Sequence, residues 1–76
     1  MKEWSFKRES LPDYLLEDMD ETERLRKIVQ TDYSMIAVIR LTSQFDLLVN
    51  SLKCAKNAGQ ISSAAAAEIR EEYSRY

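Results

Sequence analysis

The chain has 76 residues, of which 45% are hydrophobic and 32% charged, and its formal net charge is −2. It contains no His, one Cys, one Gly and one Pro. This composition excludes the common zinc sites, His-dependent catalytic triads, an internal disulfide and glycine-rich phosphate loops. We therefore expect no metal, no cofactor and no enzymatic activity. So short a chain buries only about 60% of its unfolded surface, so association with a second copy or a partner is the ordinary route to stability.

The low Gly and Pro content and the many Ala, Leu, Glu, Lys and Arg residues predict an all-α protein. We expect a single helical domain over 11–76, preceded by an N-terminal arm over 1–10. The arm contains Trp4 and Phe6, which alternate with polar residues and lack helical spacing. Aromatic side chains are rare in disordered termini, so both should pack either on the helical body or on a partner.

The first helix is predicted over 12–19, since Pro12 suits the first helical turn and Asp13 favours the helix dipole. Residues 20–23, Asp-Glu-Thr-Glu, have the form of a capping box and predict a second helix from 21. A single continuous helix from Pro12 remains the alternative. No Gly or Pro follows before Gly59, so the long central helix should reach 57. Its apolar stripes do not line up across 30–32, which predicts a bend or break there.

A short turn should end the central helix, because Gly59 can adopt the left-handed conformation that closes a helix. Ser62 is a favourable N-cap for a terminal helix over 62–75. A turn of this length makes the central and terminal helices an antiparallel helical hairpin.

The central helix is apolar on two sides. One side carries Val38, Phe45 and Leu52, and three short helices can scarcely cover both sides. The other side is our candidate self-association face, for a homo-oligomer in which a dimer is favoured: Ile36, Ile39, Leu47 and Cys54. The alternative is that the flanking helices and the aromatic arm cover this side as well.

Six acidic residues fall between Asp13 and Glu23 without a basic residue among them. They either serve helix N-terminal chemistry or present an acidic surface to a basic partner, including a surface that mimics nucleic acid and blocks a basic groove. The candidate surface for a larger protein target combines aromatic anchors with these acids: Trp4, Phe6, Tyr14, Asp18 and Glu21.

Basic residues form two small groups, which a dimer could join into a surface for nucleic acid: Lys7, Arg8, Arg24, Arg26 and Lys27. The acidic net charge and the acidic terminal helix argue against such a nucleic-acid-binding regulator. Ion pairs on a solvated helix surface are the simpler interpretation.

Cys54 has no His and no second Cys to activate it, so we expect a small buried hydrophobic residue and not a nucleophile. The N-terminus has no apolar signal segment, and Arg40 and Asp46 interrupt the most apolar stretch, which predicts no membrane association. The unpaired Cys54 fits a reducing cytoplasm best, so we expect a cytoplasmic location. The sequence thus favours a small protein–protein interaction module that acts as a regulator, inhibitor or adaptor.

Overall fold

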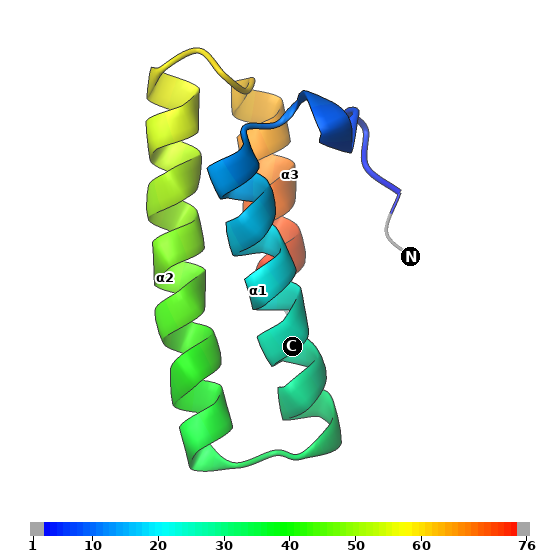
Figure 1. Ribbon diagram of the computed structural model, residues 1–76, viewed down its shortest axis with the longest axis vertical. Helices are drawn as coiled ribbons and strands as arrows, with labels where there is room; N and C mark the ends of the chain where they lie inside the picture. Colours follow the sequence, from blue (N-terminus) through cyan, green and yellow to red (C-terminus); the bar gives the residue numbers. More distant parts are fainter. Residues whose placement is uncertain (1–2, 75–76) are drawn as a thin grey trace.

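A computed structural model describes residues 3–74, and over this range the protein is all-helical. A 3-10 turn, η1, spans Arg8–Ser10, and three α-helices follow: α1 over Asp13–Thr31, α2 over Met35–Asn57 and α3 over Ser63–Tyr73. The helices α1 and α2 stand side by side and antiparallel, and α3 folds back along α2 behind them (Figure 1). The predicted helical hairpin of α2 and α3 is therefore present. The helix α1 packs against α2 and forms a layer with it.

The helix α1 is continuous, so the predicted break between residues 19 and 21 is wrong. The apolar series of the helix passes through the fully buried Thr22, whose hydroxyl donates a 2.7 Å hydrogen bond to the carbonyl oxygen of Asp18. Because this hydroxyl has a partner one turn away, a polar side chain occupies a core position without breaking the helix. No capping box forms at Asp20, whose carboxylate instead pairs with Arg8.

The single long helix predicted over 21–57 is also wrong, because the chain reverses direction between Thr31 and Met35. The predicted discontinuity at 30–32 is real, but it is a reversal and not a bend. Ser34 begins α2, and its hydroxyl accepts a 3.1 Å hydrogen bond from the amide of Ala37. This N-cap supplies a partner for one of the free amides of the first helical turn.

The turn between α2 and α3 forms as its sequence predicts. Gly59 has φ +73°, in the left-handed region that favours glycine. The amide of Gln60 donates a 2.8 Å hydrogen bond to the carbonyl of Ala55, which closes the last turn of α2. Ser62 caps α3 by accepting from the amide of Ala65 at 3.0 Å. The predicted end of this helix at 75 lies outside the described residues.

The core consists of two clusters at different heights. The larger one lies where α1, α2 and α3 meet, and includes Leu15, Met19, Leu48, Leu52 and Ile69. The smaller cluster lies near the chain reversal and contains only residues of α1 and α2: Leu25, Val29, Ala37 and Leu41. With 11 residues against 23, α3 is about 16 Å long and α2 about 34 Å. The reversal end of the molecule is therefore a two-helix layer without a third helix.

Candidate functional site: the open face of the helical hairpin

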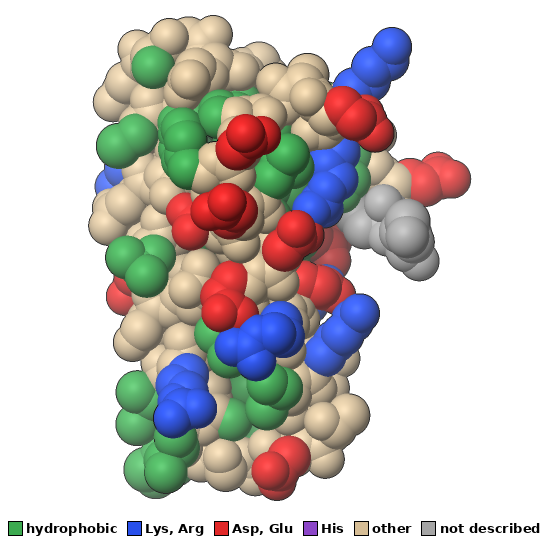
Figure 2. All heavy atoms as spheres, in the orientation of Figure 1, with side chains coloured by type: hydrophobic (Ala, Val, Ile, Leu, Met, Phe, Trp, Pro, Cys, Tyr) green, Lys and Arg blue, Asp and Glu red, His purple; other side chains and the backbone are tan. Residues whose placement is uncertain are grey.

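One broad side of the layer formed by α1 and α2 faces away from α3, and we call it the open face. Figure 2 shows this side: acidic side chains gather over the upper part of α1, basic ones below them, and hydrophobic ones along α2 and at the lower end. A groove of about 500 Å³ runs between the two helices here. Its apolar lining includes Leu25, Ile28 and Ile36, and Arg24 and Arg40 also line it.

All four residues predicted for self-association are exposed on α2. Ile36 is 66% exposed, and Ile39 and Leu47 are each 57% exposed. The alternative that the other helices and the arm cover this side is therefore wrong for the single chain. The expectation that Cys54 is buried is also wrong, because this free cysteine is exposed. The physical reason is that α1 and α3 occupy the other two sides of α2 and no element remains to cover this one.

Further apolar side chains extend this surface at the chain reversal. Tyr33 and Met35 are each 78% exposed, and Ile28 on α1 is also exposed. Tyr33 and Met35 flank the N-cap Ser34, so helix capping places both at the end of the molecule where the chain reverses between α1 and α2. Their contribution could not be predicted without the reversal, which brings Ile28 beside Ile36 in the groove.

Trp4 and Phe6, two of the predicted partner anchors, pack against the protein's own core. Their rings lie 5.3 Å apart, and Trp4 lies 6.2 Å from the ring of Tyr73 on α3. The amide of Ser5 donates a 3.2 Å hydrogen bond to Glu68, and its hydroxyl binds the same carboxylate. The arm is therefore held against α3, which agrees with the predicted alternative that its aromatic residues pack on the helical body.

The other three residues of the predicted partner surface lie on α1 and have partners within the chain. The hydroxyl of Tyr14 donates a 2.6 Å hydrogen bond to the side chain of Gln60, and Asp18 accepts one from the hydroxyl of Ser51. Glu21 forms an ion pair with Arg24 at 2.5 Å. The hydrogen bond from this guanidinium lowers the pKa of Glu21, although its partial desolvation opposes the shift. Trp4 and Phe6 thus pack against the core, whereas Tyr14, Asp18 and Glu21 bind polar groups of the same chain.

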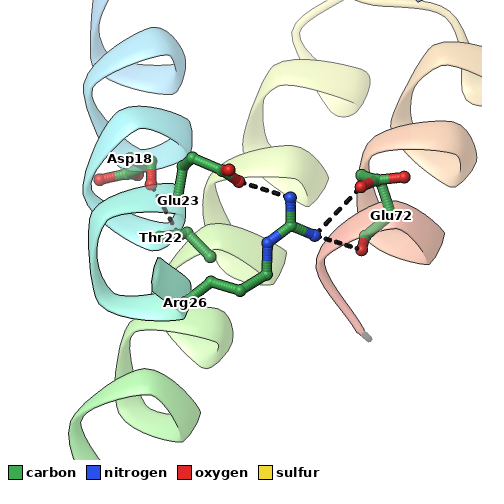
Figure 3. Close-up of polar contacts among 5 residues, drawn as sticks. All are labelled: Asp18, Thr22, Glu23, Arg26 and Glu72. Carbon is green, nitrogen blue, oxygen red and sulfur yellow. Dashed lines mark hydrogen bonds and ion pairs between the residues drawn. The ribbon is translucent and has the colours of Figure 1, made fainter. Parts of the chain in front are cut away.

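Three of the five predicted basic residues are neutralised by carboxylates. Arg8 pairs with Asp20, and Arg24 with Glu21. Arg26 lies between two helices: it binds Glu23 on α1 at 2.6 Å and Glu72 on α3 at 3.0 Å (Figure 3). The last two of the five, Lys7 and Lys27, are exposed.

A second groove, of about 760 Å³, lies on the side of α1 away from the open face, and we call it the side groove. Its lining joins the arm, α1 and α3, and includes Trp4, Arg26, Lys27 and Tyr73. The Arg26 guanidinium lies 5.0 Å from the centre of the Tyr73 ring. Burial raises the pKa of Tyr73, and the negative charge of Glu23 adds to this effect.

Over residues 3–74 the side chains do not form any group of three or more His, Cys, Asp or Glu residues suited to hold a metal ion. By length and mean hydropathy alone, 1.2 over its most apolar window, α2 is a candidate membrane span. Core helices of soluble proteins have the same properties. Comparison with protein-family models, curated proteins and solved structures gives no match.

Proposed function

We propose that the protein is a non-enzymatic interaction module that self-associates through the open face and regulates a larger protein by binding it. The observation that carries this proposal is the exposure of Ile36, Ile39 and Leu47 on a side of α2 away from its buried residues. Contiguous exposed apolar side chains on a small protein mark an interaction surface.

The larger protein is proposed to bind at the side groove, where the half-buried Trp4 and the buried Tyr73 lie beside charged residues. Trp4 combines a large apolar area with a polar N–H, the combination that is enriched at protein interfaces. Lys27 also lines this groove and is exposed, so a partner with an acidic group would complement it.

The alternative of a nucleic-acid-binding regulator receives less support. A phosphate-binding surface needs unpaired cations, whereas Arg8, Arg24 and Arg26 each bind a carboxylate of the same chain. The same ion pairs also reduce the acidic surface that a nucleic-acid mimic would need, since Asp20, Glu21 and Glu23 are their partners.

Sedimentation velocity across micromolar concentrations tests self-association. The wild-type chain should shift from monomer to dimer mass, and Leu47→Glu should remain monomeric because it places a charge in the apolar contact. Ala64→Glu is the matched control, since it adds the same charge at an exposed position on α3. A wild-type chain that stays monomeric throughout would rule out self-association.

Binding to a larger protein needs its own test. A target captured from the native host and identified by mass spectrometry should bind the purified wild-type chain, and Lys27→Glu should weaken this binding. Lys53→Glu is the control, because Lys53 is exposed on α2 and lies outside the side groove. Equal affinity of the two variants would exclude the side groove as the binding surface.

A further inference from the structure

The α1 side of the open face carries a stripe that is apolar at both ends and charged between them. Glu21, Arg24 and Ile28 line the groove, and the helical repeat continues this stripe to Glu17 and Tyr14. The positions alternate in steps of three and four residues, so the stripe has nearly the same spacing in both directions. When it is reversed about Glu21, Tyr14 falls at Ile28, and Glu17 falls at position 25, one residue from Arg24. Glu21 falls on its own copy, but its carboxylate is already paired with Arg24 of the same chain. The stripe is thus complementary to its own reversed copy on either side of its centre.

The α2 side has the same property. Its stripe consists of six exposed residues at steps of four and three: Ile36, Arg40, Ser43, Leu47, Asn50 and Cys54. Reversal about residue 45 places Ile36 at Cys54 and Ser43 at Leu47. It also places the guanidinium of Arg40 at the amide of Asn50, whose carbonyl oxygen is a hydrogen-bond acceptor. Apolar positions again meet apolar or small ones, and Arg40 does not meet its own copy.

The centres of these two stripes lie at the same height in the molecule. Asp18 accepts hydrogen bonds from both Ser51 and Gln44, so it is level with the middle of 44–51 on α2. The helices are antiparallel, so the reversal lies toward higher residue numbers on α1 and toward lower ones on α2. Three residues from this level toward the reversal are therefore Glu21 on α1 and about residue 45 on α2. A single two-fold axis can therefore pass through the centres of both stripes.

We propose that the open face binds a second copy of this chain in one defined arrangement. The two-fold axis lies along the open face and crosses α1 and α2 at the level of Glu21. Rotation about this axis packs α1 antiparallel on the partner's α1, and α2 antiparallel on the partner's α2. This arrangement rests on the proposed self-association and specifies its geometry. It places Glu17 of each copy beside Arg24 of the other. It also covers Ile36 of each copy with the region around Cys54 of the other.

Rotation about the long axis of the molecule is the competing arrangement, and the charges disfavour it. It would stack α1 on the partner's α2 at equal height. Since Arg24 and Arg40 lie across the same groove, each Arg24 would then meet an Arg40 of the other copy. The protein measures 37 × 23 × 18 Å, and the open face is its broad side (Figure 1). Stable interfaces bury about 800 Å² per partner, which a face of these dimensions can supply.

Disulfide trapping distinguishes the arrangements, because Cys54 is the only cysteine. In the proposed dimer the two Cys54 residues lie about 27 Å apart along the helices, so the wild-type chain should not cross-link. Ile36→Cys should give a covalent dimer under mild oxidation. Within one chain, positions 36 and 54 are also about 27 Å apart, beyond the Cα separation of roughly 7 Å that a disulfide allows. Any disulfide of this variant must therefore join two copies.

The matched control is Thr42→Cys, which is exposed on α2 but lies outside the stripe. We expect Ile36→Cys to cross-link at least about tenfold faster than this control, because only position 36 faces the partner's Cys54. Equal rates for the two variants, or rapid cross-linking of the wild-type chain, would overturn the arrangement. If sedimentation still shows dimers in that case, the proposed function stands and only the geometry is wrong. A chain that is monomeric throughout would overturn both.

Charge reversal provides a second test that leaves the apolar contacts intact. Glu17→Arg and Arg24→Glu should each raise the dimer dissociation constant about tenfold, because each places two pairs of like charges across the interface. The double variant restores opposite charges and should recover most of the affinity. Additive losses in the double variant would contradict the antiparallel contact.

Discussion

Arg26 joins the first helix to the last turn of the third. Its Nη1 atom donates hydrogen bonds to the side-chain carboxylate of Glu72 at 3.0 Å and to the backbone carbonyl of Glu72 at 3.1 Å. Its Nη2 atom donates a hydrogen bond to the carboxylate of Glu23 at 2.6 Å. With 15% of its side chain exposed, Arg26 is the least exposed of the ion-paired arginines. This contact holds α3 to α1, although the two helices are connected in sequence only through α2.

Arg26→Met should lower the free energy of unfolding by about 1–3 kcal/mol, the range for charged hydrogen bonds that are partly shielded from water. Glu23 and Glu72 would then face each other without a cation between them. Arg24→Met is the control and should leave stability almost unchanged, because its ion pair with Glu21 is solvated. Urea unfolding followed by circular dichroism measures both. Equal losses in the two variants would contradict a structural role for Arg26.

Leu48 and Leu47 are neighbours with opposite environments, since Leu48 is fully buried and Leu47 is exposed. Leu48→Ala should cost about 2–5 kcal/mol, which is enough to unfold much of so small a domain. Leu47→Ala should leave the stability of the monomer unchanged and weaken only self-association. Thermal unfolding at low protein concentration, with sedimentation at high concentration, separates the two effects. A large loss of monomer stability in Leu47→Ala would contradict the exposure of this side chain.

Gly59→Ala should destabilise the protein by about 1–2 kcal/mol, because alanine is strained at a positive φ. A Cβ at this position would meet no atom within 4 Å, so the effect comes from the backbone alone. Gly59→Asn should cost less, since asparagine tolerates the left-handed conformation better. Comparable melting temperatures for Gly59→Ala and the wild-type chain would show that the turn does not need this conformation.

The buried phenol of Tyr73 predicts a loss of stability at alkaline pH. Burial raises its pKa in the folded chain above the value near 10 of an unfolded chain. Below pH 10 both states keep the phenol proton, whereas at higher pH the unfolded state releases it first. The free energy of unfolding therefore falls as the pH rises through this range. Tyr73→Phe should flatten this dependence. Identical alkaline profiles for this variant and the wild-type chain would contradict the prediction.

The contact of the arm with α3 can be followed by fluorescence, because Trp4 is the only tryptophan. Glu68→Ala removes the acceptor of both hydrogen bonds from Ser5. We expect a red shift of the tryptophan emission as the arm loosens, with little change in helical circular dichroism. Glu71→Ala is the control on the same helix. An unshifted emission would show that apolar packing alone holds the arm.

The α2–α3 turn could be predicted from the sequence because its signals are local. Gly59 and Ser62 act within one helical turn of their own positions, so no tertiary contact is needed to interpret them. The exposed side of α2 was also predictable, since helical spacing places Ile36, Leu47 and Cys54 opposite the core residues of the same helix.

The division of the first half of the chain was not predictable from apolar spacing. Thr22 interrupts the apolar pattern of α1, yet it is buried and satisfied by the carbonyl of Asp18. The reversal before α2 contains neither Gly nor Pro, and its only local signal is Ser34 as an N-cap. Without that reversal, the α1 half of the open face could not be placed beside α2.

The unequal lengths of α2 and α3 have a consequence for the dynamics of the single chain. At the reversal end, the cluster that contains Leu25 and Leu41 receives no contribution from α3. Backbone amides near Leu41 should therefore open to solvent more often than those near Leu48, where three helices meet. Amide hydrogen exchange would then decrease in rate from the reversal toward the Gly59 turn.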